Sequence, residues 1–257
     1  MTAYRVTMLA MGTGEVPGPE LYWMSGWDEW YPLLFQVALI EGDGVTALVN
    51  TGPARDLGPM NSKWREVLGT RAEFRRGHGQ FVLEQLTAHG VRPDAVTHVI
   101  LTPLQLYTVS NVAEFGHAQI CLSRTGWLHF HSTHEHPHDD RATSLPDDVL
   151  THLVTDAWPR MRLLGDEDEI VPGIRTWWAG AHHRASIVVE VDTVVGTTAI
   201  SDSYFYLENV ANRHPIGICE NLYEAVAAYD RVAADGKIVV PLYDPKNQDR
   251  FPGGRIG

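Results

Sequence analysis

Cysteine is scarce in this sequence: Cys121 and Cys219 are the only two among 257 residues. They stand in apolar stretches and form no paired spacing, so the chain offers no disulfide framework. We expect two reduced, structural thiols, as in a cytoplasmic protein.

Positive charge and long hydrophobic runs are scarce too. The 20 Lys and Arg residues face 32 Asp and Glu residues, and the resulting net charge of −12 argues against binding to nucleic acid or to an anionic membrane. No stretch approaches the roughly 18 apolar residues of a membrane-spanning helix, and the amino-terminal MTAYRVTMLAMG lacks the features of a secretory signal. We therefore expect a cytoplasmic protein that binds a small molecule, with a homodimer as the alternative use of its surface.

A linker or low-complexity segment is the last feature that the sequence lacks. With 44% hydrophobic residues, the chain has enough apolar side chains for a full core. We therefore expect a single domain over residues 1–257.

Apolar runs of strand length recur along the chain. Several are apolar nearly throughout, as strands covered on both faces are. The predicted strands are residues 4–10, 35–41, 46–50, 97–102, 119–122, 174–179, 187–191, 198–201 and 237–241. Helical spacing of apolar residues predicts helices over 79–89 and 220–234, and the acidic run at 166–169 is typical of a solvated turn.

The early part of the chain contains a hairpin, because Gly42, Asp43 and Gly44 supply a turn between two apolar runs. Strand and helix alternation follows this hairpin. The pattern predicts an α/β fold of the α+β kind, an αββα sandwich in which two mixed β-sheets are flanked by helices.

The order of these motifs resembles the metallo-β-lactamase superfamily, and within it the N-acyl-homoserine lactonase branch. FQVALIEGDGVTALVNTGP is similar to the early hairpin of that family, and LTAHGVRPDAVTHVILT to its helix and strand before the metal loop. FGHAQICLSRTGW, VPGIRTWWAGAHHRASIVVEV, TTAISDSYFYLENV and IVVPLYDPKNQDRFPGG resemble later segments in the same order. The resemblance implies the metallo-β-lactamase fold and a hydrolase of the dinuclear-metal type.

The metal ligands that the resemblance implies are mostly replaced in this chain. The signature of that family, His-x-His-x-Asp-His, falls on Pro103, Gln105, Tyr107 and Thr108 in this chain. The later His of the family falls on Tyr243, and its early Asp falls on Asn50. The bridging Asp remains as Asp202, and the Gly-His ligand as His182 unless the register aligns Ala181 instead. So few ligands cannot hold two metal ions, and we expect no metal and no cofactor.

Without a metal, His182 and Asp202 would face one cleft, where they can pair as an imidazole oriented by a carboxylate, a general base. Arg184 beside them is suited to a substrate carboxylate or oxyanion, and His183 is a weaker candidate for substrate contact. A buried polar network left behind by the lost metal site is the structural alternative.

Tyr107 and Tyr243 replace an acid and an imidazole on opposite walls of the same expected pocket. Their hydroxyls can donate to a carbonyl oxygen or relay protons, although simple filling of vacated space explains them as well. Gln105 and Thr108 are suited to orient a substrate or to bond nearby backbone, and Asp244 is typical of a turn or cap.

Two further clusters stand out. LHFHSTHEHPHDD places five histidines between His129 and His138, a spacing that permits a metal but is more typical of a solvated loop. LYWMSGWDEWYPLLF contains Trp23, Trp27 and Trp30, which we interpret as walls of a substrate pocket or as a dimer contact.

Three functional hypotheses follow. The leading one is a metal-independent enzyme that acts on a small cyclic or carbonyl-bearing molecule by acid–base chemistry, in lactone or ester hydrolysis or in cyclisation, elimination or isomerisation. The alternatives are a non-catalytic ligand-binding protein and a metallohydrolase with relocated histidine ligands.

Overall fold

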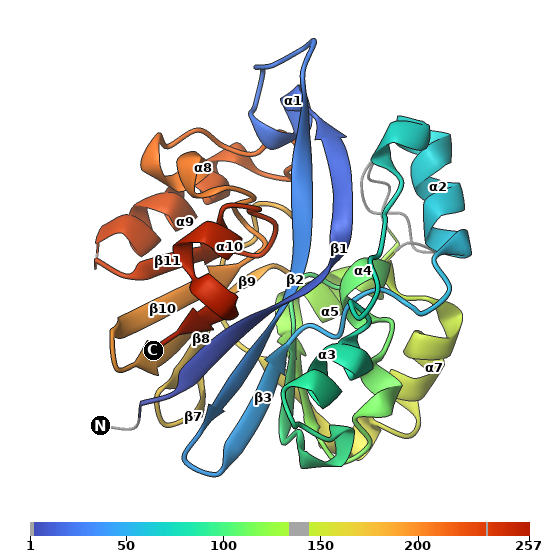
Figure 1. Ribbon diagram of the computed structural model, residues 1–257, viewed down its shortest axis with the longest axis vertical. Coiled ribbons are helices and arrows are strands. Elements are labelled where there is room, and N and C mark those ends of the chain that lie inside the picture. Colours follow the sequence, from blue (N-terminus) through green and yellow to red (C-terminus); the bar gives the residue numbers. More distant parts are fainter. Residues whose placement is uncertain (1–2, 134–143, 235) are drawn as a thin grey trace.

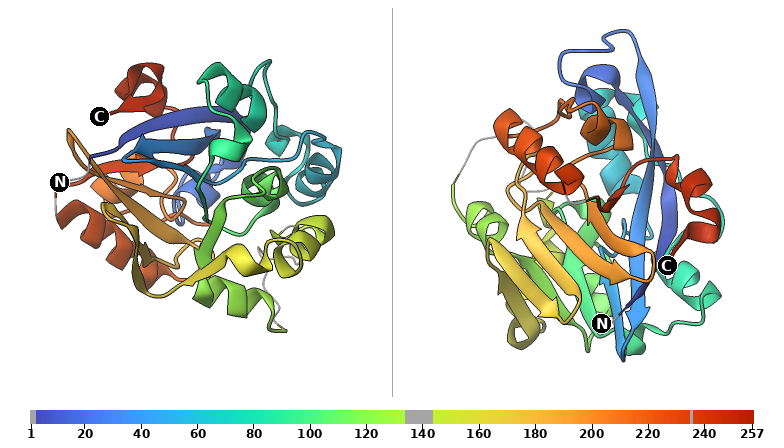
Figure 2. Two further views of the ribbon diagram at one scale, coloured as in Figure 1. Left: turned by 90° about the horizontal axis from the view of Figure 1, so that it is seen from below. Right: turned by 90° about the vertical axis from the view of Figure 1, so that its left-hand side faces the viewer.

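The structure is a computed structural model that describes residues 3–133, 144–234 and 236–257. Two β-sheets pack face to face, and helices cover their outer faces (Figures 1 and 2). Both sheets contain parallel and antiparallel pairs. The predicted αββα sandwich of two mixed sheets is therefore confirmed.

The first sheet has seven strands in the order β12-β1-β2-β3-β4-β5-β6. The strands are β1 (Arg5–Pro17), β2 (Trp30–Gly42), β3 (Val45–Val49), β4 (His98–Leu101), β5 (Gln119–Ser123), β6 (Met161–Leu164) and β12 (Arg255–Ile256). The predicted turn joins β2 to β3, where Asp43 and Gly44 take φ values of 48° and 74°. Two successive left-handed residues match the twist of a tight hairpin, which is why an Asp-Gly pair occupies this position.

The second sheet has five strands in the order β11-β10-β9-β8-β7. They are β7 (Glu167–Val171), β8 (Ile174–Trp178), β9 (Ile187–Thr193), β10 (Gly196–Ser201) and β11 (Ile238–Pro241). The strand β7 corrects the prediction of a solvated turn at 166–169. It is an edge strand with only Ile170 buried, so its charged residues face solvent and hide the strand pattern.

The helices lie outside the two sheets (Figure 1). They are α1 (Gly18–Leu21), α2 (Gly58–Leu68), α3 (Val82–Ala88), α4 (Leu106–Val109), α5 (Arg124–Phe130), α7 (Asp147–Val154), α8 (Leu207–Ala211), α9 (Leu222–Ala234) and α10 (Asn247–Arg250). The two predicted helices correspond to α3 and α9. Within the described residues, no helix has both the length and the apolar character that crossing a membrane requires.

The strands β1 and β2 extend well beyond their predicted bounds. They remain paired from Arg5 opposite Glu41 to Pro17 opposite Trp30, and α1 follows at their far end (Figure 1). In β1 the extension escapes prediction because Gly12, Gly14 and Glu15 interrupt the apolar pattern, and in β2 the added part contains Pro32. It matters for function, because it builds one wall of the cavity described below.

Candidate active site

A buried histidine–aspartate pair lies where the two sheets meet. His182 Nδ1 is 3.0 Å from Asp202 Oδ2, and the two side chains are 3% and 0% exposed. Asp202 directly follows β10, whereas His182 lies in the turn between β8 and β9. In that turn Gly180 and Ala181 both have positive φ, 58° and 64°, which glycine adopts freely and alanine only at a cost, and the chain turns there so that His182 meets Asp202.

Two hydroxyl groups fix the Asp202 carboxylate. Thr102 donates a hydrogen bond of 2.5 Å to Oδ1, and Ser186 donates one of 2.5 Å to Oδ2. Thr102 follows β4 in the first sheet, so the carboxylate joins the two sheets. With His182 as a third donor, both carboxylate oxygens are satisfied, and Asp202 holds the proton of His182 on Nδ1 and leaves Nε2 as an acceptor.

His182 forms part of the wall of a cavity of about 270 Å³. Most of the wall is aromatic or aliphatic, and the aromatic members are Phe35, Trp64, Tyr107, Phe205 and Tyr243. Two ring pairs of the wall meet edge to face: the Tyr107 and Tyr243 centroids are 6.2 Å apart, and those of His182 and Phe205 are 4.9 Å apart. The cavity therefore presents the imidazole inside a largely apolar space, as small-molecule sites do.

Tyr243 is a fully buried phenol at this wall. Burial, followed by the neighbouring Tyr107 and Asp202, raises the pKa of Tyr243 well above its ordinary value. Its hydroxyl therefore keeps its proton at neutral pH, and a hydrogen bond with Tyr107 acts in the same direction. Tyr107 is half-buried and also lines the cavity.

Gln105 and His183 line the cavity as well. Gln105 Nε2 lies 3.3 Å from Ser144 Oγ. The backbone N–H of His183 donates to Ser186 Oγ at 3.1 Å. The centroid of the His183 ring is 4.1 Å from the centroid of the His182 ring. The structure thus brings together His182, Asp202, Tyr107, Tyr243, Gln105 and His183, although their roles stay predictions.

Thr108 does not contact the cavity, which corrects its prediction as a substrate ligand. Its hydroxyl lies 2.6 Å from the carbonyl oxygens of both Pro103 and Gln105, and it accepts from Gln105 N at 3.2 Å. These bonds close the first turn of α4. Thr108 therefore shapes the loop that presents Gln105 and Tyr107.

Arg184 is also placed differently from its prediction. It forms ion pairs with Glu220 and Glu224, and its guanidinium lies 5.1 Å from the centroid of the Trp178 ring. Its charge is already matched by two carboxylates, so it is not free to bind a substrate anion in the large cavity. Arg184 joins the β8–β9 turn to α9.

The three tryptophans lie outside the cavity wall too. Trp23 and Trp27 are 44% and 67% exposed, and the Trp30 ring lies 4.9 Å from the Arg71 guanidinium. The extension that carries them projects beyond the rest of the sheet at the top of Figure 1, and none of the three lines the cavity, so their predicted role as its walls is corrected. Their alternative interpretation, a contact with a second copy, stays a prediction.

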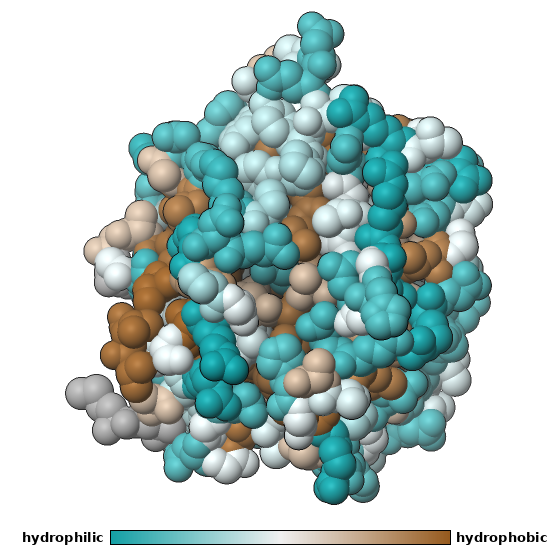
Figure 3. Space-filling view, viewed as in Figure 1, coloured by the Kyte–Doolittle hydropathy of each residue, from teal (hydrophilic) through white to brown (hydrophobic). Residues whose placement is uncertain are grey.

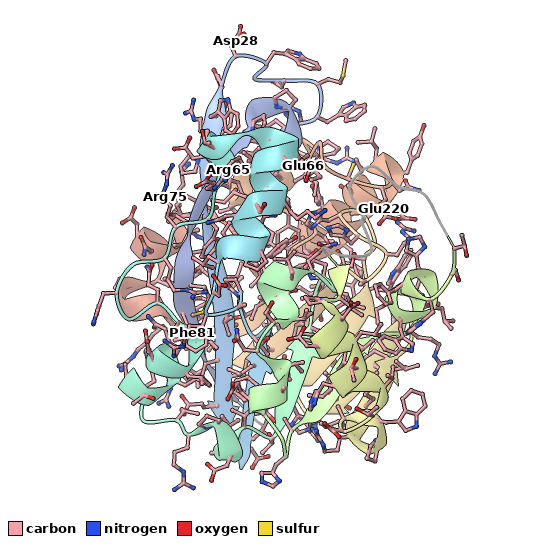
Figure 4. All side chains as sticks on the ribbon, turned by 90° about the vertical axis from the view of Figure 1, so that its right-hand side faces the viewer. Asp28, Arg65, Glu66, Arg75, Phe81 and Glu220 are labelled. Carbon is pink, nitrogen blue, oxygen red and sulfur yellow. The ribbon has the colours of Figure 1, made fainter. Side chains whose placement is uncertain are left out.

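Two parts of the cavity escaped the sequence-based reasoning. Glu20 from α1 lines it, and so do Lys63, Trp64 and Glu66 from α2, the helix in front of the sheet in Figure 4. Burial raises the pKa of Glu20 to about 7. A lone Glu in GPEL is indistinguishable in sequence from a helix-start residue, so no local signal marks it.

The residues at the expected metal positions do not fit a dinuclear centre. Asn50 donates from Nδ2 to the Thr102 carbonyl at 2.7 Å and accepts from Thr102 N at 2.8 Å, so it ties β3 to β4. Both oxygens of Asp202 accept hydrogen bonds already. Among the residues that the structure describes, no group of three His, Cys, Asp or Glu side chains is placed to hold a metal ion. The relocated-ligand hypothesis depends largely on residues 134–143, which lie outside the described residues.

The chain matches no protein-family model and no curated protein sequence. Solved structures, by contrast, match over nearly its whole length. An N-acyl homoserine lactone hydrolase with N-hexanoyl-L-homoserine bound at its catalytic metal centre has a TM-score of 0.80 and 16% identity, covering 98% of this chain and 99% of that one.

Two further structures are similar. A probable metal-dependent hydrolase from Staphylococcus aureus has a TM-score of 0.77 at 12% identity, covering 95% of this chain and 91% of that one. A dizinc quorum-quenching lactonase has a TM-score of 0.66 at 12% identity, covering 99% and 90%. At this identity the likeness establishes the fold, and the metallo-β-lactamase fold that the resemblance implies is confirmed.

Proposed function

We propose that this protein is a metal-independent enzyme that acts on a small, largely apolar, carbonyl-bearing molecule by acid–base chemistry. The observation that carries the proposal is the His182–Asp202 contact of 3.0 Å at the wall of an aromatic cavity. A buried carboxylate that orients an imidazole is the usual device for a general base near neutral pH.

In this mechanism His182 Nε2 accepts a proton from the substrate or from a water molecule. Asp202 holds the Nδ1–H and stabilises the imidazolium that forms, because its negative charge lies at hydrogen-bond distance. Thr102 and Ser186 keep the carboxylate in place during this step. A positioned base of this kind contributes roughly 10²–10⁴-fold to the rate.

The developing negative charge on the substrate oxygen needs hydrogen-bond donors. Tyr243 keeps its proton because its pKa is raised by burial, and Tyr107 lies against it. Donors that are held in an apolar cavity stabilise an oxyanion more strongly than water does, because they need no reorganisation. We assign this role to the two tyrosines and assign substrate orientation to Gln105 and His183.

The similar structures are hydrolases, and this likeness favours lactone or ester hydrolysis within the proposed class. Cyclisation, elimination and isomerisation are compatible with the same residues, because each requires only proton transfer and oxyanion stabilisation. A non-catalytic ligand-binding protein would retain the same aromatic cavity, and it is the competing outcome of the test below.

The test compares His182→Gln and Asp202→Asn with the wild-type chain on a panel of lactones, aryl esters and β-hydroxy carbonyl compounds. We expect kcat to fall roughly 10²–10⁴-fold in both variants, because His182→Gln removes the base and Asp202→Asn removes the carboxylate that orients it. His98→Gln at the start of β4, outside the cavity wall, is the matched control and should retain full activity. Unchanged kcat in both site variants would contradict the proposal, and binding without turnover would favour the ligand-binding alternative.

A further inference from the structure

We propose that Glu20 is a specificity residue and that the natural ligand of the cavity carries a protonated amine, which the Glu20 carboxylate binds. The inference rests on the proposed function only in placing a small-molecule ligand in this cavity. It adds a chemical class to that ligand: an apolar body with a cationic nitrogen.

The backbone around Glu20 is fixed. The Glu20 carbonyl accepts hydrogen bonds from Gly217 N at 2.8 Å and from Ile218 N at 3.1 Å. A Cβ on Gly217 would lie 1.6 Å from the Pro19 carbonyl oxygen, so only glycine permits this approach. The two segments therefore hold α1 in place, and Glu20 and Ile218 reach the cavity together.

The Glu20 carboxylate has no hydrogen bond or ion pair within the described part of the chain. Two glutamates whose side chains are well buried do have partners: Glu190 pairs with Lys237 at 2.8 Å, and Glu220 with Arg184 at 2.6 Å. Glu20 is only partly exposed, and a partly dehydrated carboxylate without a partner favours the binding of a cation. A cation brought by the ligand would supply the missing partner.

The charged groups near Glu20 do not supply a partner for its carboxylate. Burial alone raises the pKa of Glu20 to about 7, and no basic neighbour lowers it. Lys63 and Glu66 on α2, with His182 and His183 deeper in, are the other charged or titratable groups of the wall besides the two tyrosines. Lys63 is exposed, where water satisfies its ammonium group.

The rest of the wall suits the same kind of ligand. Trp64 and Tyr107, whose centroids are 5.8 Å apart, offer aromatic surfaces that accept either an apolar body or a cation over the ring face. A protonated Glu20 that donates to a neutral acceptor is the rival role. The two roles predict opposite effects of pH on binding.

Calorimetric titration with two probes of matched size, 2-phenylethylamine and 2-phenylethanol, tests this inference. At about pH 8, Glu20 is ionised and the amine is still protonated. We expect the wild-type chain to bind the amine at least about tenfold more tightly than the alcohol, because a charge-assisted hydrogen bond forms only with the amine. Amine affinity should fall about tenfold between about pH 8 and about pH 6, as Glu20 takes up its proton.

Glu20→Gln should abolish both the preference for the amine and its dependence on pH, while alcohol affinity is retained. Glu114→Gln is the matched control, because it removes an exposed carboxylate that does not line the cavity, and it should behave like the wild type. Glu20→Asp keeps the charge and should keep part of the preference. Melting curves establish that each variant is folded.

Equal or weaker binding of the amine by the wild type, a preference that persists in Glu20→Gln, or no binding of either probe would overturn the inference. Amine affinity that rises as the pH falls would instead support the rival donor role and would also overturn it. The readout is binding at equilibrium, so it is independent of turnover. His182→Gln should keep the preference for the amine, which separates failure of this inference from failure of the proposed function.

Discussion

The side chains that replace the expected metal ligands form two groups with different roles. Asn50 and Thr108 bond to backbone atoms and fix the loops around them. Gln105, Tyr107 and Tyr243 line the cavity instead. The sequence marks all of these positions, because the family resemblance aligns them, but it does not separate the two groups. Their separation depends on side-chain direction, which only the folded chain fixes.

The role of a single hydroxyl group can be tested at Tyr243. Tyr243→Phe removes a buried hydroxyl and leaves the ring, so we expect the free energy of unfolding to change by less than about 1 kcal/mol. The turnover number should fall about 10–100-fold, because the oxyanion loses a donor. Steady-state kinetics with chemical denaturation measures both quantities. A large loss of stability with unchanged turnover would assign Tyr243 to packing alone.

Arg184 shows a limit of inference from neighbours in sequence. It follows His182 and His183 directly, and this adjacency suggested a shared site. In the fold its side chain turns to Glu220 and Glu224 on the other side of the β8–β9 turn. Those two partners lie far along the chain, and no spacing rule connects them to Arg184.

At the scale of elements, strands with buried faces were predictable and surface elements were not. The central strands of both sheets have continuous apolar runs, such as Val37–Ile40 within β2, and each was predicted from that pattern. The edge strand β7 and the helix α2 escaped prediction, because most of their residues are polar and exposed. The cavity uses such an element, so its wall could not be assembled from the sequence.

The helix α2 contributes one aromatic side chain, Trp64, to the cavity wall. This side chain contacts Phe35 and Tyr107 with ring centroids 5.7 and 5.8 Å away. We expect Trp64→Ala to raise KM about tenfold, because about 1.5 kcal/mol of apolar and aromatic contact with the ligand is lost. The effect on kcat should be smaller, since α2 carries no acid–base group at His182. Initial-rate measurements over a range of substrate concentrations separate the two effects, and an unchanged KM would exclude α2 from the ligand contact.

For the molecule as a whole, the small-molecule partner stays a prediction. The net charge is −12, and most of the face in Figure 3 is hydrophilic. Two of the exposed hydrophobic residues, Val194 and Val195, lie in the β9–β10 turn and do not line the cavity. The single domain and the homodimer stay predictions.

Glu20 should make the stability of the whole domain depend on pH. Its pKa is about 7 in the folded chain, above its ordinary value of 4.5, so the folded state binds the proton more tightly. The contribution of Glu20 to the free energy of unfolding is fully present below about pH 4.5 and is lost as the pH rises through about 7. Glu20→Gln should therefore be more stable than the wild type at about pH 8, by up to about 3 kcal/mol, and nearly equal at about pH 4.5. Denaturant titrations at both pH values measure the difference; an equal difference at both would refute the raised pKa.

The central claim is that His182 and Asp202 perform acid–base catalysis without a metal ion. The most direct measurement is turnover of untagged, chelator-dialysed protein, on the panel compound that it converts fastest, before and after addition of Zn²⁺, with metal content determined in the same samples. We predict less than about a tenth of an equivalent of metal, the same turnover in both samples, and loss of turnover in His182→Gln. Turnover that disappears on dialysis and returns with Zn²⁺ would contradict the account.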